Sequence, residues 1–364
     1  MNYTKLYHWF HKLYALTPYT IFSNGYALPP LQIFFELTYN CNLRCKMCQF
    51  LPLISNYDKS EARKEELSLD EVKSIIDQLP RYALITFTGG EPFLRKDFFE
   101  ILEYVSKRNK YHIVTNGSYL TEENAQKIVS LGCENLLSKG LLMLGVSLEG
   151  NQESHDKLVG VQGSFLKTIQ GLEYLKHYKK KSHKKFPLLN MAVVISKWNY
   201  KDIHKMVRVA EENNIDIISF LAENHMPLEN KDHLEIDDLK SYRPKLPEYD
   251  VKGIREEIEK IEQLKNETKV EIKFSPPGVP VQNIIDQYGA VFPMQEYGCF
   301  SPWSKLVISS NGNVFPCQSY KMGNLRELPL NKIWNGNKAR EFRKSIKQEG
   351  LFPLCSNCCM LEKT

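Results

Sequence analysis

The chain has 364 residues, of which 42% are hydrophobic and 25% are charged, and its formal net charge is +5. This length and composition predict a soluble globular protein of about two domains, each with enough apolar residues for a core. No basic segment alternates with aromatic residues, so we expect no nucleic-acid partner. The N-terminal apolar stretch contains Lys5, His8, His11 and Lys12, and no run of about eighteen apolar residues occurs, so we expect neither a signal peptide nor a transmembrane segment.

From residue 31 onward, short apolar runs alternate with segments of helical period. Strands are predicted at 33–37, 82–87, 112–115, 142–148, 188–195 and 215–221. Capping patterns at Ser68–Glu71 and Thr121–Asn124 indicate the starts of two of the helices between them. Six strands with intervening helices predict a parallel α/β sheet, in which the loops that follow the strands gather on one face.

Four segments are predicted along the chain. Residues 1–30 form a helical extension whose apolar stripe, from Leu6 to Tyr14, packs on the sheet or binds a partner or a membrane surface. Residues 31–224 form the α/β domain, and residues 225–297 form a charged connector with a helix at 254–264 and a strand at 269–274. Residues 298–364 begin with a hairpin in which 303–308 turns through 310–313 into 314–315.

The nine cysteines fall into a group of three at 41–48 and a group of five at 299–359, with Cys133 alone between them. This uneven grouping differs from the framework of a small secreted disulfide protein and indicates metal binding in a reducing compartment, so we expect a cytoplasmic protein. Cys133 follows a helical pattern and is expected to be a core side chain.

The first cysteine group, Cys41, Cys45 and Cys48, lies on one short loop after the first strand. A cubane iron–sulfur cluster takes four thiolates, so a loop that offers three leaves one iron able to bind another ligand. The alternatives are a zinc site and a ferredoxin-type cluster. Zinc would need a fourth cysteine or histidine nearby, and His112 is the first histidine after the loop.

Three further motifs lie where the next strands end. Gly89-Gly90-Glu91-Pro92 follows the second strand, Thr115-Asn116-Gly117 closes the third, and Ser147-Leu148-Glu149-Gly150 closes the fourth. Glycine lets the backbone approach a ligand closely, and Glu91 adds a carboxylate that can face a cation. A simple Gly-Gly turn between a strand and a helix is the alternative.

In this order, the four motifs resemble those of the radical S-adenosylmethionine (SAM) superfamily. The resemblance implies a partial (βα)6 barrel over residues 31–224, in which the open iron of a 4Fe-4S cluster held by Cys41, Cys45 and Cys48 binds the amino and carboxylate groups of SAM. It further implies that one electron from the cluster cleaves SAM to methionine and a 5′-deoxyadenosyl radical, which abstracts hydrogen from a substrate.

The same resemblance implies five cofactor-binding residues: Gly89, Gly90, Glu91, Asn116 and Ser147. The chain departs from the common pattern at three places. Met47 stands where an aromatic residue is usual, Glu149 stands where Asp is commoner, and Val159 stands where Arg often precedes Gly160. The last departure removes one expected contact to the SAM carboxylate.

The C-terminal cysteines resemble those of the SPASM/Twitch auxiliary-cluster domain. The resemblance implies a second 4Fe-4S cluster held by Cys299, Cys317, Cys355 and Cys358, with Cys359 as an alternative to Cys358. Full SPASM domains bring seven cysteines and two clusters, so we expect the shorter Twitch form with one cluster. Four thiolates saturate such a cluster, which favours a role in electron transfer. A structural four-cysteine zinc site is the alternative.

We therefore expect a radical SAM oxidoreductase that abstracts hydrogen from an organic substrate and oxidises it through the auxiliary cluster. The expected partners are a small polar or sugar-like molecule or a short peptide as substrate, and a reductant such as flavodoxin or ferredoxin. A radical enzyme that epimerises or cross-links peptides is one alternative. A non-catalytic metal-binding or electron-transfer protein is another, and no catalytic acid or base is marked by spacing.

Overall fold

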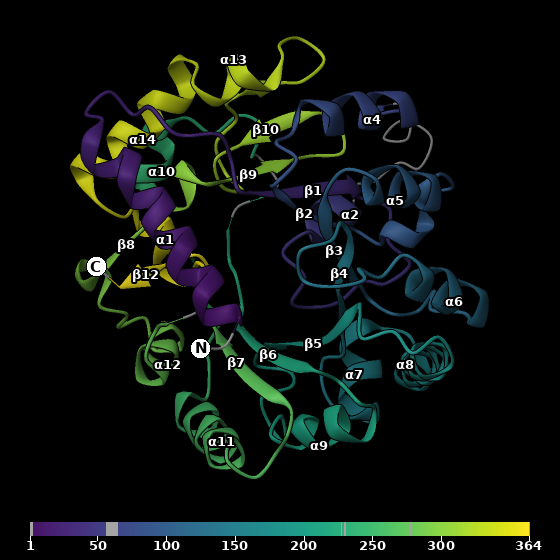
Figure 1. Cartoon of the computed structure of the whole chain (residues 1–364). Helices are drawn as coiled ribbons and strands as arrows, with labels where there is room; N and C mark the ends of the chain where they lie inside the picture. The colour runs from purple at the N-terminus through teal and green to yellow at the C-terminus, as the bar shows by residue number, and fades with distance from the viewer. Residues whose placement is uncertain (1–2, 56–64, 227, 229–230, 277, 364) are drawn as a thin grey trace.

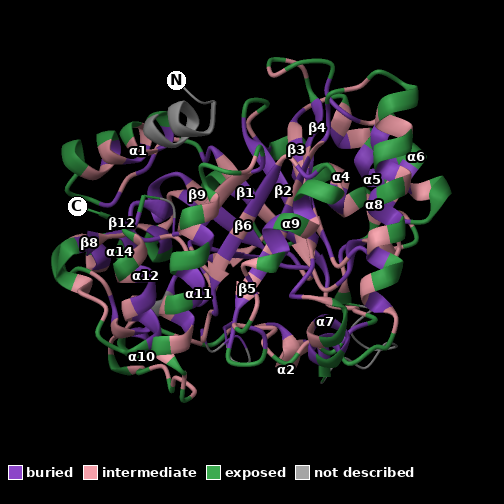
Figure 2. Cartoon of the chain, turned by 90° about the horizontal axis from the view of Figure 1, so that it is seen from below, coloured by how far each residue is buried: buried purple, intermediate pink, exposed green. Residues whose placement is uncertain are grey.

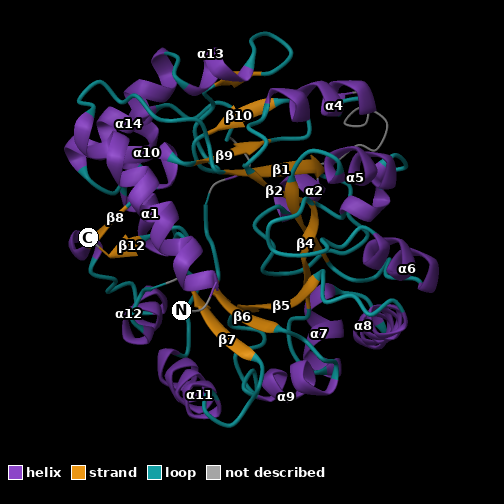
Figure 3. Cartoon of the chain, viewed as in Figure 1, coloured by secondary structure: helices purple, strands orange, loops and turns teal. Residues whose placement is uncertain are grey.

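The computed structural model describes residues 3–55, 65–226, 228, 231–276 and 278–363, with the side chains of residues 3–9 and 357 left undescribed. Its centre is a curved sheet in the strand order β11-β10-β9-β1-β2-β3-β4-β5-β6-β7, with helices around its outer side (Figures 1 and 3). The parallel strands are β1 (Gln32–Thr38), β2 (Leu84–Gly89), β3 (Lys110–Thr115), β4 (Gly140–Ser147), β5 (Leu188–Ile195), β6 (Ile217–Ala222), β7 (Glu271–Ser275) and β9 (Lys305–Ile308). The antiparallel strands are β10 (Asn313–Phe315) and β11 (Gly323–Asn324) in the large sheet, and β8 (Tyr297–Gly298) with β12 (Glu362–Lys363) in a separate pair.

The helices alternate with the strands of the barrel, and five more of the described helices follow β6. Around the barrel they are α1 (Tyr3–Ile21), α2 (Leu51–Ser55), α4 (Leu69–Gln78), α5 (Phe98–Ser106), α6 (Glu122–Ser130), α7 (Gln152–Val159), α8 (Ser164–Lys181) and α9 (Lys205–Glu212). They continue as α10 (Ile236–Ser241), α11 (Val251–Leu264), α12 (Val281–Tyr288), α13 (Leu330–Trp334) and α14 (Asn337–Glu349), with short 3-10 turns η1 (Pro92–Leu94), η3 (Met294–Glu296), η4 (Ser301–Trp303) and η5 (Pro353–Asn357). Both predicted caps are present: Ser68 closes a capping box with Glu71, and the Thr121 side chain accepts a hydrogen bond from the Asn124 amide.

The predicted α/β fold with a parallel sheet is confirmed. All six predicted strands are present as β1 to β6, and no bound differs from its prediction by more than two residues. The predicted strand at 269–274 is β7, which pairs in parallel with β6, and the predicted hairpin is β9 with β10. Because β7 pairs with β6 and β9 pairs with β1, both strands belong to the same sheet as the six predicted strands. The predicted domain boundaries at residues 224 and 297 therefore do not separate one sheet from another, and they stay a prediction.

The barrel strands bury one face and leave the other partly accessible. In β3 and β5, buried residues alternate with residues of intermediate exposure along the whole strand. Figure 2 shows buried residues along the strands and exposed residues on the outer sides of the helices. Because successive side chains of a strand point to opposite faces, the buried set packs under the helices and the other set lines the lumen. The lumen is therefore the accessible interior of the molecule.

The helix α1 lies near the amino ends of the barrel strands (Figure 1). It packs through the buried residues His11 and Ala15, and the Tyr14 hydroxyl donates a hydrogen bond of 2.7 Å to the Pro29 carbonyl. Phe10 and Leu13 of the predicted apolar stripe remain 49% exposed, whereas the Leu6 and Trp9 side chains of that stripe lie outside the described residues. No helix in the described part of the chain combines the length and apolarity needed to span a bilayer.

Candidate metal and cofactor site

The cysteine loop is fastened to the end of β2 by backbone hydrogen bonds. The amide of Gly90 donates to the Thr38 carbonyl at 2.6 Å, and the amide of Glu91 donates to the Asn40 carbonyl at 2.8 Å. A Cβ atom on Gly90 would lie 2.3 Å from the Asn40 carbonyl oxygen, and Gly89 has a φ of +125°. The two glycines are thus required for the close contact with the chain that enters the cysteine loop.

The other side of the cysteine loop rests on the last turn of α7. The amides of Arg44 and Lys46 donate to the carbonyls of Val159 and Leu158 at 3.3 and 3.1 Å, and Leu43 packs against the same two residues. Val159, at the position where an arginine was expected, is 1% exposed and belongs to this apolar contact. An arginine there would place a charge in the packed interface, so the departure has a structural reason.

The thiols of Cys41, Cys45 and Cys48 act electrostatically on one another, which places them together at the carboxyl end of β1. Burial raises the pKa of all three thiols, that of Cys48 to about 11. Metal binding opposes such a shift because a metal ligates the thiolate. The described residues contain no group of three His, Cys, Asp or Glu side chains set to hold a single metal ion. The buried carboxyl groups of Glu91 and Glu149 also act on these thiols. Three thiols fit an iron–sulfur cluster with one open position.

Glu91 is a positioning residue. Its buried carboxylate accepts hydrogen bonds from the Thr115 hydroxyl at 2.8 Å, the Asn116 amide at 2.8 Å and the Phe93 amide at 3.2 Å. Burial raises the pKa of Glu91 to about 7. The carboxylate thus holds the turn that ends β3, and the Asn116 side chain donates to the Asn42 side chain in the cysteine loop at 3.0 Å. The structure brings Gly89, Gly90, Glu91 and Asn116 to one place, and Ser147 ends the neighbouring strand β4, whose Val146 pairs with Thr115.

A hydrogen-bonded connection from β4 to α7 supports this site. The His155 Nδ1 atom accepts from the Glu149 amide at 3.1 Å, and its Nε2 atom lies 3.3 Å from the Ser164 hydroxyl. The Asp156 carboxylate accepts from the amides of Gly163 and Phe165 at 2.7 and 2.8 Å. His155 lies nine residues before Ser164, and Asp156 lies nine residues before Phe165, so the equal spacing of the two pairs is the sign of this connection in the sequence.

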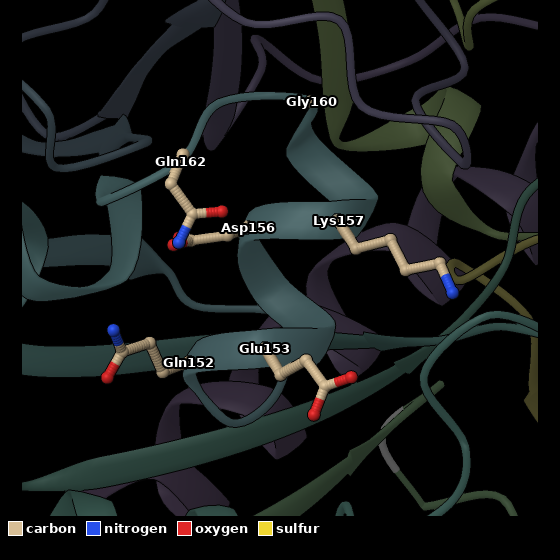
Figure 4. A pocket seen from close by; sticks show the side chains of 6 residues that line it. All are labelled: Gln152, Glu153, Asp156, Lys157, Gly160 and Gln162. Atoms are coloured by element: carbon tan, nitrogen blue, oxygen red, sulfur yellow. The ribbon is translucent and has the colours of Figure 1, made fainter.

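The surface of α7 also carries a cavity of about 680 Å³, shown in Figure 4. Its lining residues are Gln152, Glu153, Asp156, Lys157, Gly160 and Gln162. Asp156 is the buried one of these, and both of its carboxylate oxygens are already hydrogen-bonded. Asp156 is therefore occupied within the protein, and the cavity lies on the surface of α7, the helix that supports the cysteine loop.

The second cysteine group is assembled by the pairing of β8 with β12. Gly298 is in register with Glu362, which brings Cys299 next to the turn that contains Cys355 and Cys358. Electrostatic interactions link Cys299 with Cys317, and Cys355 with both of these. The Cys358 thiol also interacts with Cys299 and Cys355.

Cys358 and Cys359 differ in their surroundings. Cys358 faces the other thiols of its group, and its pKa is raised by a hydrogen bond with Cys359 and by burial. The same hydrogen bond lowers the pKa of Cys359 to about 7, with a further contribution from nearby Lys305. Of the two, Cys358 is the one that interacts electrostatically with Cys299 and Cys355, and its role as the fourth ligand stays a prediction. Cys133, by contrast, is buried with Leu84 in a separate apolar cluster, as expected of a core side chain.

Sequence spacing gave no sign of the polar groups that the barrel strands bring together. His112 of β3 occupies a lumen-facing position, where burial and nearby Lys273 lower its pKa to about 4. Beyond the end of β6, the Tyr249 hydroxyl donates to Glu223 at 2.7 Å and lies 2.7 Å from the His225 Nε2 atom. Burial raises the pKa of Glu223 to about 7. These residues come from segments that are far apart in the sequence.

A parallel partial barrel with a three-cysteine loop after its first strand and a Gly-Gly-Glu turn after its second defines a radical SAM protein. The profile of the radical SAM superfamily matches residues 35–210, and that of SPASM, an iron–sulfur cluster-binding domain, matches residues 299–359. The chain belongs to the radical SAM superfamily and carries a SPASM-type auxiliary-cluster domain. It therefore binds SAM, a SAM-binding 4Fe-4S cluster and an auxiliary iron–sulfur cluster.

The chain is similar to several characterised proteins. An AdoMet-dependent heme synthase of Methanosarcina barkeri is 27% identical over 349 residues, which cover 90% of this chain and 88% of that protein. An Fe-coproporphyrin III synthase of the same organism is 30% identical over 52% of this chain, but the match spans only 43% of that protein. The crystal structure of Streptococcus suis SuiB bound to precursor peptide SuiA has a TM-score of 0.63 at 19% identity, covering 94% of this chain and 73% of that chain. The last similarity concerns the fold alone.

Proposed function

We propose that this protein abstracts hydrogen from an organic substrate held in the barrel lumen and oxidises that substrate, with the auxiliary cluster as electron acceptor. The observation that carries the proposal is the placement of the two cysteine groups. The first group follows the carboxyl end of β1, whereas Cys299 precedes the amino end of β9, and the two strands pair in parallel. The groups thus lie at opposite ends of one strand pair, roughly 20 Å apart for a seven-residue strand. A substrate in the lumen has access to both.

The residues of each site fit the groups they would hold. Cys41, Cys45 and Cys48 supply three thiolates and leave one position for SAM, whose binding site we assign to Gly89, Gly90, Glu91, Asn116 and Ser147. Cys299, Cys317, Cys355 and Cys358 supply four thiolates and saturate the auxiliary cluster. When bound, SAM and its cluster supply the radical that removes hydrogen, and the auxiliary cluster supplies an acceptor for one electron.

The lumen wall supports a polar substrate. His112, Asn190, Ser219 and Lys273 occupy lumen-facing positions, and the Ser219 hydroxyl donates to the Asn190 side chain at 2.8 Å. Because burial keeps its pKa near 4, His112 is neutral at pH 7 and can both donate and accept a hydrogen bond. Such a wall positions a molecule with hydroxyl, amide or carboxylate groups better than an apolar one.

Two substrate classes have support among the relatives. The heme synthase and the Fe-coproporphyrin III synthase favour a small organic molecule of the tetrapyrrole kind, and the former relative aligns over most of both chains. A cysteine-type anaerobic sulfatase-maturating enzyme of Clostridium novyi, 24% identical over 89% of this chain and 86% of that enzyme, favours a peptide or protein substrate. We propose the small organic substrate first and peptide modification second. A flavodoxin or ferredoxin as reductant and a cytoplasmic location complete the proposal.

The test is anaerobic reconstitution with iron and sulfide, followed by SAM and a strong reductant. We expect about eight irons per chain, four for each cluster, and formation of 5′-deoxyadenosine and methionine. A variant with Cys41, Cys45 and Cys48 all changed to Ala should lose cleavage and about half of the iron. Cys133→Ala is the matched control, because Cys133 is buried away from both groups.

Cys317→Ala separates the two clusters. We expect it to lose the auxiliary iron yet to cleave SAM, while oxidation of the substrate stops. Zinc in place of iron, or no cleavage by fully loaded protein, would overturn the proposed function and favour a metal-binding or electron-transfer protein.

A further inference from the structure

We propose that the lumen binds its substrate through a carboxylate group, which Lys273 of β7 and Lys305 of β9 hold. The inference rests on the proposed function in one respect, because both place the substrate in the same lumen. It adds the chemical class of the substrate and the two residues that would recognise it.

Strand register places both lysines on the lumen side. Lys273 pairs with Ser219, and the adjacent Phe274 stacks on Phe220 of the helix-covered face, with ring centres 5.6 Å apart. Lys305 precedes Leu306, which is fully buried. Because neighbouring side chains of a strand point to opposite faces, the two lysines face inward.

The two strands lie at distant positions in the sheet, yet they meet at one turn. The Lys305 ammonium contacts the Met360 sulfur at 3.5 Å, and the Ser275 hydroxyl of β7 donates to the Cys359 carbonyl at 3.5 Å. The turn at residues 359–360 therefore bridges the open side of the barrel. Lys273, two residues before Ser275, and Lys305 flank this turn from its two sides.

The charges of these lysines are poorly compensated. The acidic partner found for Lys273 is Glu271, at 3.6 Å on the same strand, and no carboxylate of the described residues lies within ion-pair distance of Lys305. Burial lowers the pKa of Lys273. Elsewhere the fold neutralises a buried lysine fully, since Lys231 lies 2.7 Å from Glu36. Both ammonium groups are only partly buried, with the Lys273 side chain 32% exposed, so they are accessible to an anionic ligand, which would add a charge-assisted hydrogen bond.

A different role for Lys305 must be separated from this one. Its charge acts on the thiols of Cys299 and Cys359, so it can also balance the negative charge of the auxiliary cluster. Such a role would change the reduction potential of that cluster and leave ligand binding unaltered. For Lys273, the described residues show no interaction with a cysteine thiol.

The experiment is a fluorescence titration of the reconstituted protein, in the presence of SAM, with coproporphyrin III and with its tetramethyl ester. The two probes share the macrocycle and differ in their four carboxylates. A second arm uses a glutamate-rich peptide and the same peptide with glutamine. We expect the wild-type protein to bind a carboxylate probe at least tenfold more tightly than its neutral counterpart, since a hydrogen bond to a charged group is worth about 1.5–3 kcal/mol.

Variants test the two lysines. We expect Lys273→Gln and Lys305→Gln each to weaken binding of the carboxylate probe by roughly tenfold or more, and Lys→Arg at either position to retain it. Lys179→Gln is the matched control, because Lys179 is also a partly buried lysine, 3.5 Å from a carboxylate, on the outer helix α8. Iron content and the thermal unfolding midpoint of each variant show that it is folded.

Selective binding of coproporphyrin III that is lost in the Gln variants supports the proposal, with a small molecule as the source of the carboxylate. The same result with the glutamate-rich peptide supports the proposal with a peptide as the source. Three results would overturn the proposal. They are equal affinity for charged and neutral probes, binding that survives in the double Gln variant, and no binding of either charged probe to the wild-type protein. A shift in auxiliary-cluster potential without a loss of binding would overturn the assignment of Lys305. Failure of SAM cleavage overturns the proposed function and leaves this titration unaffected.

Discussion

Gly90 fixes the distance between the turn after β2 and the cysteine loop after β1. Any side chain there would meet the Asn40 carbonyl oxygen at 2.3 Å. We predict that Gly90→Ala lowers the free energy of unfolding by about 1–3 kcal/mol and reduces iron bound to the first cysteine group, because the two loops must move apart. Urea denaturation and iron analysis measure this. Gly145→Ala is the control, since its Cβ would have its nearest contact at an ordinary 3.5 Å; equal behaviour of the two variants would contradict the prediction.

Glu223 predicts a pH dependence of stability. Its pKa is about 7 in the folded protein, above the ordinary value of 4.5, because the carboxyl is buried. Between these two values the folded state keeps a proton that the unfolded state has released, so the free energy of unfolding falls as the pH rises from about 4.5 to 7. The total change should be about 3 kcal/mol. Glu223→Gln cannot titrate, so unfolding curves of the two proteins should diverge over this range; parallel curves would show that the pKa is not raised.

At the scale of elements, α7 holds the cysteine loop in place. Its last turn accepts backbone hydrogen bonds from Arg44 and Lys46, and Asp156 ties it to the start of α8. Loop and helix thus form one unit, although they come from segments more than one hundred residues apart in the sequence. The support of the site therefore comes from β4 and α7 as much as from β1.

We predict that Asp156→Ala destabilises the protein by about 2–4 kcal/mol, because two buried backbone amides lose their acceptor. The amides of Arg44 and Lys46 should then exchange hydrogen faster, which mass spectrometry of exchanged peptides detects. Glu153→Ala changes an exposed acidic residue of the same helix and should alter neither quantity. Unchanged exchange in Asp156→Ala would mean that α7 does not hold the loop.

At the scale of the whole molecule, Lys231 joins three parts of the chain. Its ammonium lies 2.7 Å from the Glu36 carboxylate of β1, 2.7 Å from the Tyr39 hydroxyl, and 4.9 Å from the ring centre of Phe315 in β10. The connector, the barrel and the C-terminal hairpin therefore share one buried charged contact. Removal of either charge should therefore destabilise all three parts of the chain.

We predict that Lys231→Met costs about 3–5 kcal/mol of stability, because the buried Glu36 carboxylate is left without its counter-charge. The double variant Glu36→Gln, Lys231→Met should cost much less than the sum of the two single changes. Chemical denaturation of the four proteins of this cycle gives the coupling free energy. A coupling near zero would show that the pair adds nothing to the joining of the three parts.

The extent of prediction differed between the fold and the site. The strands were predictable because the strands of a parallel sheet are largely apolar runs, as in residues 141–146. The pairing of β7 with β6 and of β9 with β1 in one sheet was not, because pairing depends on long-range contacts that leave no local pattern. For the same reason the sequence marked Gly90 and Glu91 as a motif but did not show that they hold neighbouring loops, and Lys231 could not be recognised as an anchor.

The sequence by itself determined the parallel α/β class, the radical SAM family and the two cysteine groups, because cysteine spacing and the order of short motifs are local properties of the chain. Only the tertiary structure decided what surrounds them. The different surroundings of Cys358 and Cys359, the packing of Val159 under the cysteine loop, and the inward-facing Lys273 and Lys305 all depend on which distant segments meet. The physical reason is that burial and charge compensation are set by neighbours in space.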